Sequence, residues 1–140
     1  MKPRNRVVAY ITRGDKLLVF RHIMYPEAGV QTPAGHPETG ESLDAAVMRE
    51  AEEETGLKGL KMERYLGSKT YDFTEQCAGL ERRHFYHLSY AGDSPERWLS
   101  YEHSPSDGTP SPVEFEMYWI RLRGAELDWG HGDMLDKIEC

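Results

Sequence analysis

The sequence contains few cysteines and no long hydrophobic run. Only Cys77 and Cys140 among its 140 residues are cysteines, and two cysteines cannot form the disulfide framework that stabilises many small secreted domains. No apolar stretch approaches the roughly 20 residues of a membrane-spanning helix. The first ten residues, MKPRNRVVAY, lack the apolar block of a signal peptide. We therefore expect a cytoplasmic protein in a reducing environment, with no membrane partner.

Positive charge is also scarce in this chain. There are 17 Lys and Arg residues against 24 Asp and Glu residues, and the formal net charge is −7. Nucleic-acid-binding domains usually carry a basic patch or stripe, whereas the short basic groups at 2–6 and 81–83 are typical of solvated edges. We expect no nucleic-acid partner. An acidic protein can still bind phosphates when a divalent cation lies between the two negative partners.

The length and composition favour one globular domain over residues 1–140. Apolar residues make up 39% of the chain and aromatic residues 11%, which is typical of a packed protein. Several segments are strand-like, with alternating apolar residues or many aromatic side chains. These segments are residues 6–12, 16–20, 60–67, 68–73, 83–90 and 113–122. We expect the first two to form a hairpin, and we expect a mixed α/β or α+β domain.

The remaining segments are rich in glycine, proline and polar residues. We expect residues 21–40 to be a loop with one short strand near Val30, and residues 91–112 to be a long surface loop. A short helix is expected in the tail from Met134. Neither an internal repeat nor a linker is present to indicate a second domain.

Residues 42–55 have the spacing of an α-helix and are followed by Gly56, which suits a left-handed C-terminal cap. Residues three and four apart share a helix face. One such face begins apolar and becomes acidic; it consists of Leu43, Val47, Glu50 and Glu54. Surface glutamates normally lie opposite the apolar stripe of a helix, so glutamates in line with that stripe require an explanation.

Two interpretations of the acidic helix remain open from spacing alone. Crowded carboxylates repel one another, and Arg49 by itself cannot balance Glu50, Glu53 and Glu54. A hard divalent cation such as Mg²⁺, which takes carboxylate, carbonyl and water ligands, would balance them. The alternative is a solvated acidic face with a purely structural role.

Residues 35–57, GHPETGESLDAAVMREAEEETGL, resemble the signature of the Nudix hydrolase family. That signature consists of Gly, five residues, Glu, seven residues, Arg-Glu, an apolar residue, any residue, Glu-Glu, any residue, Gly and an apolar residue. The positions in register are Gly35, Glu41, Arg49, Glu50, Ala51, Glu53, Glu54, Gly56 and Leu57. The resemblance covers 23 of the 140 residues.

The resemblance implies an α/β/α sandwich with a mixed β-sheet. It also implies hydrolysis, dependent on Mg²⁺ or Mn²⁺, of the pyrophosphate linkage in a nucleoside diphosphate joined to another moiety X. The expected partner is such a small molecule, and the expected assembly is a monomer or homodimer. The alternative is a catalytically silent module of this fold that binds a nucleotide or a protein partner. Because such modules tend to lose the acidic cluster, the complete cluster favours the enzyme.

The resemblance also implies roles for individual residues. The expected metal ligands are Glu50, Glu53, Glu54 and the backbone carbonyl of Ala34. The expected catalytic residues are Glu53 and Glu50, one of which accepts a proton from water, together with Arg49, which orients a glutamate. Glu41 is expected to fix the loop to the helix or to bind an outer-sphere ion.

Many family members use one more acidic residue from a later loop or strand. The best candidates for this further metal ligand are Glu114 and Glu116, which precede Trp119. Glu102 is a weaker candidate. All three are carried over from the family pattern and not from local spacing.

Substrate contacts are less clearly marked in the sequence. The candidates are Arg21, His36, Tyr71 and Phe73. Arg21 would contact a phosphate, although a solvated strand end explains it equally well. Tyr86 and Trp129 are further aromatic residues that would stack on a base, but such residues more often belong to a core.

The chain departs from the family pattern in one place, and it lacks a signature that marks one subgroup. Many members have Gly-Gly where this chain has Ala34-Gly35, but alanine supplies the same backbone carbonyl. The run SQPWPFP, which marks members that act on NADH, is absent. The sequence therefore indicates the reaction and leaves X open.

Overall fold

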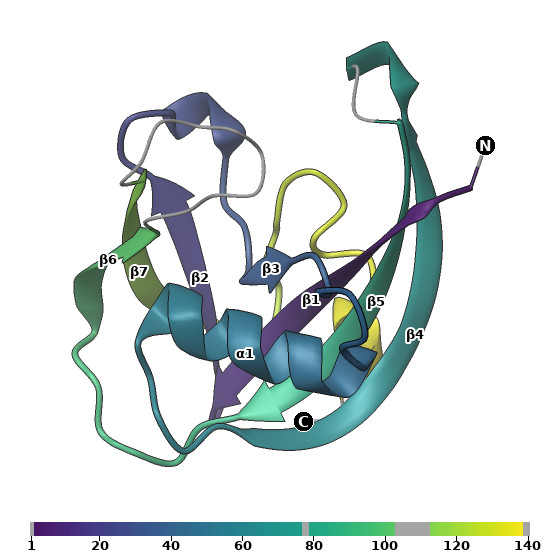
Figure 1. Cartoon of the computed structure of the whole chain (residues 1–140). Coiled ribbons are helices and arrows are strands. Elements are labelled where there is room, and N and C mark those ends of the chain that lie inside the picture. Colours follow the sequence, from purple (N-terminus) through teal and green to yellow (C-terminus); the bar gives the residue numbers. More distant parts are fainter. Residues whose placement is uncertain (1, 77–78, 103–112, 139–140) are drawn as a thin grey trace.

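The computed structural model describes residues 2–76, 79–102 and 113–138. Cys77, Cys140 and residues 103–112 of the expected long loop lie outside the described residues. Within that part, the chain forms a curved seven-stranded sheet with a helix across its concave face (Figure 1). None of the helices in the described part has the length and apolar character that a membrane span requires.

The sheet is mixed, with strand order β4-β5-β1-β2-β7-β6 and β3 paired separately with β1. The strands are β1 (Arg4–Arg13), β2 (Lys16–His22), β3 (Ala34–Gly35), β4 (Lys61–Phe73), β5 (Gly79–Ser89), β6 (Arg97–Glu102) and β7 (Val113–Arg121). β1 and β5 pair in parallel, and the other strand pairs are antiparallel. The predicted hairpin of the first two strands is confirmed.

The α-helix is α1 (Leu43–Thr55), and its predicted ends are confirmed. The Ser42 side chain accepts a hydrogen bond from the Ala45 N–H at 3.1 Å, which caps the first turn. Gly56 has a φ of 75°, and its N–H donates to the Glu52 carbonyl at 2.9 Å. A residue without a Cβ adopts this left-handed conformation at little cost, so the helix ends there.

The sheet separates two hydrophobic cores. Val7, Ala9 and Ile11 of β1 face α1 and pack with Ala46 and Val47. Alternate residues of the same strand face the other side, where Val8 and Tyr10 pack beneath the C-terminal segment. β1 is therefore buried on both faces, as expected for a central strand.

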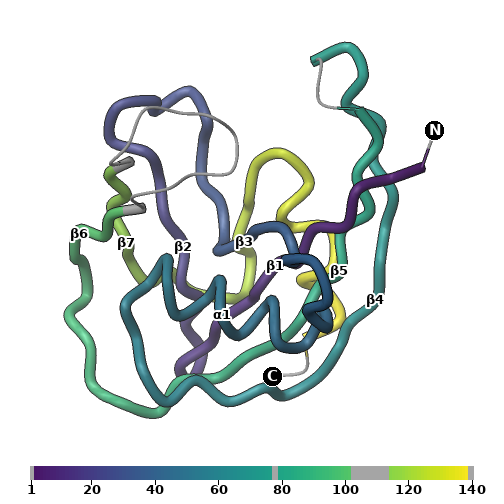
Figure 2. Tube along the Cα trace, in the orientation of Figure 1, coloured from purple at the N-terminus to yellow at the C-terminus, as the bar shows by residue number. Residues whose placement is uncertain are grey.

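The expected α/β/α sandwich with a mixed sheet is confirmed, with unequal outer layers. One face of the sheet is covered by α1, while the other is covered by residues 122–138, which contain the short 3₁₀ helix η3 (Leu135–Lys137). This 3₁₀ turn is the short helix expected in the tail. Two further 3₁₀ turns, η1 (Pro26–Ala28) and η2 (Thr74–Gln76), lie in loops. Figure 2 shows the C-terminal segment rising beside β3.

Three predicted elements differ from the structure. β6 lies inside the segment expected to be a loop, because pairing with β7 (Arg97↔Tyr118 to Glu102↔Val113) stabilises a strand that local composition does not favour. β4 is one bulged strand and not two. The expected short strand is β3, while near Val30 there is only an isolated bridge between Phe20 and Gln31.

Candidate active site

A pocket of about 420 Å³ lies where α1, β3 and the C-terminal segment meet. Its walls also include ends of β2, β4 and β5, so segments far apart in the sequence build it together. Glu50 and Glu54 line it beside Ala34 and Gly35. Two of the three predicted metal ligands on α1, Glu50 and Glu54, therefore line the pocket. They lie next to Ala34, whose backbone carbonyl is the fourth predicted ligand.

The two-residue strand β3 holds these carboxylates in place. The Ala34 N–H donates to Oε2 of Glu54 at 2.8 Å, and Glu54 is only 6% exposed. A Cβ at Gly35 would lie 2.1 Å from the carboxyl carbon of Glu50. Only glycine therefore permits so close an approach between β3 and the helix.

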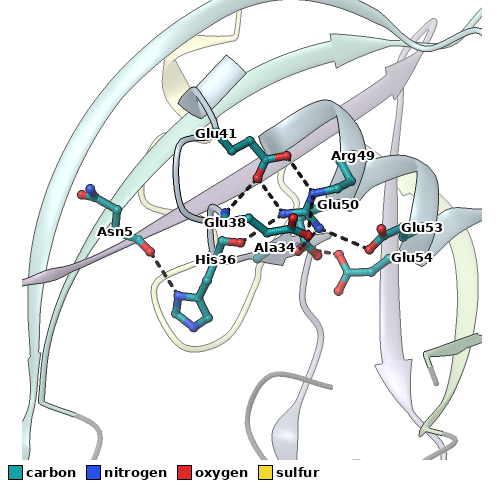
Figure 3. Close-up of polar contacts among 9 residues, drawn as sticks. All are labelled: Asn5, Ala34, His36, Glu38, Glu41, Arg49, Glu50, Glu53 and Glu54. Carbon is teal, nitrogen blue, oxygen red and sulfur yellow. Dashed lines mark hydrogen bonds and ion pairs between the residues drawn. The ribbon is translucent and has the colours of Figure 1, made fainter. Parts of the chain in front are cut away.

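Arg49 connects the loop before α1 with the helix itself (Figure 3). Its Nε and Nη2 donate to the two oxygens of Glu41 at 2.8 and 2.9 Å, a bidentate pair. Nη1 donates to Glu50 at 2.9 Å and to Glu53 at 3.4 Å, and Nη2 also donates to the His36 carbonyl at 3.1 Å. One guanidinium therefore positions carboxylates from both segments.

The same hydrogen bonds shift the pKa values of the pair. The Arg49 hydrogen bonds, followed by the Glu38 backbone N–H, lower the pKa of Glu41 from 4.5 to about 2. Hydrogen bonds to Glu41 raise the pKa of Arg49 still further above its usual range. Glu41 is therefore ionised at any physiological pH, and its predicted role of fixing the loop to the helix agrees with this geometry.

Glu53 lies outside the pocket. Its side chain is 61% exposed and reaches back to Arg49, whereas Glu50 is 13% exposed. Within the described residues, no three His, Cys, Asp or Glu side chains are already grouped around one point that would hold a metal. The donor set nevertheless fits Mg²⁺ or Mn²⁺, because pocket carboxylates and backbone carbonyl oxygens are hard ligands.

The structure does not bring the later acidic candidates to this pocket. Glu116 pairs with Arg21 (2.9 Å) and Arg97 (3.2 Å), which lie on the two strands beside β7. Phe115 on β7 packs with the core beneath α1, so alternation places Glu114 and Glu116 on the opposite face of the sheet. Arg21 is on that face too, and none of these three residues lines the pocket. The structure describes no side chain for Glu102.

The other substrate candidates are distributed differently. Phe73 lines the pocket, and Tyr71 lies behind it with its ring stacked on Phe73. Burial, helped by the Asp133 carboxylate, raises the pKa of Tyr71. His36 turns away, with Nδ1 3.1 Å from the Asn5 carbonyl, and burial lowers its pKa. Tyr86 is a core residue whose hydroxyl donates to Asp44 at 2.9 Å.

The pocket residues that sequence reasoning missed include Arg6, Arg83 and His131. The expectation that 81–83 is a solvated edge is wrong for Arg83, which is 5% exposed. Its guanidinium lies 4.6 Å from the centre of the Tyr71 ring on the neighbouring strand and 2.7 Å from Glu81. The signal was the alternation of β5, where Arg83 shares a face with the buried Phe85.

His131 is almost fully buried, at 2% exposed. Its Nδ1 accepts hydrogen bonds from the Thr32 backbone N–H at 3.2 Å and the Thr32 hydroxyl at 3.0 Å. Burial, and next the charges of Arg83 and Arg6, hold the pKa of His131 well below its usual range. This histidine is therefore neutral, with its proton on Nε2. No local pattern marks it, since Thr32 is 99 residues away.

The fold and the site together define a mixed α/β domain with a pocket that carries the carboxylates of Glu50 and Glu54 beside the backbone of Ala34 and Gly35. A model of the NUDIX domain matches residues 2–138. The chain belongs to the Nudix domain family, as the resemblance of residues 35–57 implied.

Similar proteins include hydrolases that are named for NAD-capped RNA. The chain is 29% identical over 126 residues to the NAD-capped RNA hydrolase NudC of Stutzerimonas stutzeri (strain A1501), covering 83% of this chain and 42% of the relative. It is 36% identical over 67 residues to NudC of Pseudomonas aeruginosa (strain LESB58), covering 48% and 24% respectively. The chain thus spans less than half the length of these relatives.

Solved structures of the same fold were also found. One is a UDP-X diphosphatase with a TM-score of 0.66 and 18% identity, covering 97% of this chain and 61% of that one. At this identity the likeness concerns the fold alone. It agrees with the sandwich that the sequence predicted.

Proposed function

We propose that this protein hydrolyses the pyrophosphate linkage of a nucleoside diphosphate joined to another moiety X, using Mg²⁺ or Mn²⁺. The observation that carries the proposal is the position of Glu50 and Glu54 in one pocket with Ala34 and Gly35. A separate argument is the Arg49 network, which holds Glu41, Glu50 and the loop in one arrangement. A solvated acidic helix with a purely structural role would require neither the pocket position of these glutamates nor the Arg49 network.

The proposed metal ligands are Glu50, Glu53, Glu54 and the carbonyl of Ala34. When bound, the cation neutralises phosphate charge and lowers the pKa of a water molecule. Glu54 is oriented by the Ala34 N–H, and Glu50 by Arg49. The Glu53 side chain is exposed, and its ion pair with Arg49 at 3.4 Å contributes little to stability. A change of rotamer can therefore turn it from Arg49 toward the pocket.

The chain's own residues supply the proton transfer. Glu50 or Glu53 accepts the proton of the attacking water, and Arg49, which donates to Glu50 at 2.9 Å, holds Glu50 in position.

The substrate is proposed by class. The relatives are named for NAD-capped RNA, and the structural neighbour for UDP-X, so their names support a nucleotide derivative with an organic X. The acidic net charge supports a small-molecule substrate. We propose a cytoplasmic monomer or homodimer, in line with the low cysteine content; cell fractionation and light scattering test these two points.

The proposal is tested with purified protein, Mg²⁺ or Mn²⁺, and a panel of substrates with identification of products. The panel contains ADP-ribose, NADH, UDP-glucose, a dinucleoside polyphosphate, coenzyme A and an NAD-capped oligoribonucleotide. We expect cleavage between the two phosphates of at least one compound and no cleavage with EDTA. Thermal stabilisation by a compound without any product would instead identify a silent binding module.

The double variant Glu53→Gln plus Glu54→Gln tests the metal site. We expect it to lose at least about 100-fold in rate, as removal of acid–base groups usually does, and to lose affinity for Mn²⁺. Unchanged cation binding in a folded double variant would identify a purely structural acidic helix. The panel with the capped oligoribonucleotide decides between small-molecule and RNA-linked substrates.

A further inference from the structure

The pocket has a second end that differs chemically from the carboxylate end. We call it the ring end; it consists of Arg6, Phe73, Arg83, Trp129 and His131. Two arginines there face one glutamate, Glu81, at 4.0 and 2.7 Å. This end thus combines aromatic surface with arginine charge, whereas Glu50 and Glu54 carry negative charge at the other end.

Trp129 is held in the pocket wall in a strained conformation. Among the described residues it is the one non-glycine residue with a positive φ, 56°, and it is 50% exposed although it is large and apolar. The Arg83 guanidinium donates to its carbonyl. Backbone strain of this kind costs about 1–3 kcal/mol and persists where surrounding structure imposes it, often at ligand sites.

Phe73 forms the adjoining part of the wall and is supported from behind. Its ring is parallel to that of Tyr71, with centroids 5.7 Å apart, and edge-on to Trp129 at 6.3 Å. Arg83 lies against both Tyr71 and Phe73, at 4.6 and 5.3 Å. The Tyr71 hydroxyl donates to Asp133 at 2.7 Å. Ring contacts and hydrogen bonds within the protein therefore hold this part of the wall together.

His131 contributes one directional polar group to this end. A backbone N–H can only donate, so the bond from Thr32 to Nδ1 places the imidazole proton on Nε2. Among the described residues, none accepts a hydrogen bond from this Nε2–H. His131 lines the pocket, so the remaining donor is available to a molecule bound there.

We propose that the ring end binds a flat heteroaromatic ring against Phe73 and Trp129, and that the Nε2–H of His131 donates to an acceptor on that ring. The acceptor is a ring carbonyl or an unprotonated ring nitrogen. A ring of this kind occurs either in the nucleobase or in X. Binding of the ring does not depend on the proposed function; only the statement that the bound molecule is cleaved at its pyrophosphate rests on it. A ligand without an acceptor leaves a buried donor unpaired and is therefore disfavoured.

The proposal is tested by calorimetric binding without metal, which requires no turnover. The probes are AMP, UMP and nicotinamide mononucleotide, with ribose 5-phosphate as the ligand that lacks a ring. We expect at least one nucleotide to bind about tenfold or more tightly than ribose 5-phosphate, as base–aromatic stacking provides. Preference for AMP or UMP assigns the ring to the nucleobase, and preference for nicotinamide mononucleotide assigns it to X.

Variants separate binding from structure. Trp129→Gly removes the ring but suits the positive φ, so we expect an unchanged or higher melting temperature with about tenfold weaker nucleotide binding. His131→Phe removes the donor, so we expect this variant to lose nucleotide binding. His131→Gln supplies an N–H again, so we expect it to bind nucleotides more weakly than the wild type but more tightly than His131→Phe. Tyr101→Ala on β6, an exposed aromatic residue outside the pocket, is the matched control and should bind as the wild type does.

The proposal is wrong if no nucleotide binds more tightly than ribose 5-phosphate. It is also wrong if the folded variants Trp129→Gly, His131→Phe and His131→Gln all bind nucleotides as tightly as the wild type does. Failure of the proposed function has a different signature, because the nucleotide probes would then still bind at the ring end while no pyrophosphate compound of the substrate panel is hydrolysed in the presence of Mn²⁺. The two outcomes are therefore distinguishable.

Discussion

At the scale of single residues, Arg49 joins two segments that would otherwise be held only by the backbone. It donates to Glu41 in the loop and to Glu50 in the helix, with its side chain 24% exposed. Its planar fork matches a carboxylate in a way that a lysine ammonium does not. The orientation of the metal-binding carboxylates therefore depends on the shape of this side chain as well as on its charge.

Arg49→Lys is expected to keep the fold but to lower the rate of hydrolysis by about 10- to 100-fold, because lysine cannot bind Glu41 and Glu50 at once. Steady-state kinetics with the best substrate of the panel measures this change. Arg97→Lys on β6, which alters an exposed pair with Glu116, is the control and should retain the wild-type rate. An Arg49→Lys enzyme as fast as the wild type would contradict the positioning role.

Glu41 predicts a pH dependence of stability. Its pKa is lowered in the folded protein from 4.5 to about 2 by Arg49, so its stabilisation is fully present above the unfolded value. The stabilisation is lost as pH falls from about 4.5 toward about 2. We expect Glu41→Gln to be less stable than the wild type at pH 7 and equally stable near pH 2. Chemical denaturation across this range measures the difference, and a difference independent of pH would contradict the assignment.

Gly35→Ala is expected to displace Glu50, since the new Cβ would lie 2.1 Å from its carboxyl carbon. Overpacking of this kind costs about 1–3 kcal/mol, and the affinity for Mn²⁺ should fall with it. Gly132→Ala is the matched control, because its Cβ would make ordinary contacts of 3.6 Å with Leu127 and Leu135. The free energy of unfolding and cation titrations of both variants provide the measurement.

At the scale of elements, β6 completes the C-terminal end of α1. The indole N–H of Trp98 donates to the Thr55 carbonyl at 3.0 Å, and the Ser100 hydroxyl donates to the Glu54 carbonyl. The last carbonyls of a helix have no partner within it, so these bonds from a distant strand satisfy them. They also fix the backbone of the buried Glu54.

Trp98→Phe removes this donor while keeping an aromatic ring in the core. We expect a loss of about 1 kcal/mol in the free energy of unfolding, or more if the carbonyl stays dry, together with weaker Mn²⁺ binding because Glu54 is less well held. Leu99→Ala, on the exposed side of the same strand, should change neither quantity appreciably. Equal effects of the two changes would show that β6 acts only by general packing.

At the scale of the whole molecule, the sheet brings together two pocket ends from separate parts of the chain. The carboxylate end comes from β3 and α1, while the ring end comes from β1, β4, β5 and the C-terminal segment. The C-terminal segment is anchored beneath β1 through the Tyr10 hydroxyl, which donates to the His131 carbonyl. Burial raises the pKa of Tyr10, so this hydroxyl remains a donor.

Divalent cations are expected to stabilise the folded protein as a whole. Mn²⁺ at 100 times its dissociation constant should add about 2.7 kcal/mol, provided that it binds only the folded state. EDTA should abolish hydrolysis without unfolding the protein, because Arg49 already holds Glu41 and Glu50. Thermal melts with Mn²⁺ and with EDTA measure this, and a melting temperature unaffected by Mn²⁺ would contradict a cation site in the pocket.

The sequence by itself determined the helix, its ends and its acidic face. Capping at Ser42 and Gly56 and the spacing of Glu50 and Glu54 depend on neighbours within a few residues. The resemblance of residues 35–57 was likewise contained in one continuous stretch and led to the correct family and sandwich. Features that depend on local spacing are readable from one chain.

Only the tertiary structure decided which other residues join this helix. It pairs Glu116 with Arg21 and Arg97 away from the pocket, and it brings Arg83 and His131 into the pocket. β6 likewise exists because β7 pairs with it. Each outcome depends on strand pairing and burial between segments tens of residues apart, and apart from the alternation of β5 that buries Arg83, such contacts leave no periodic mark in the sequence.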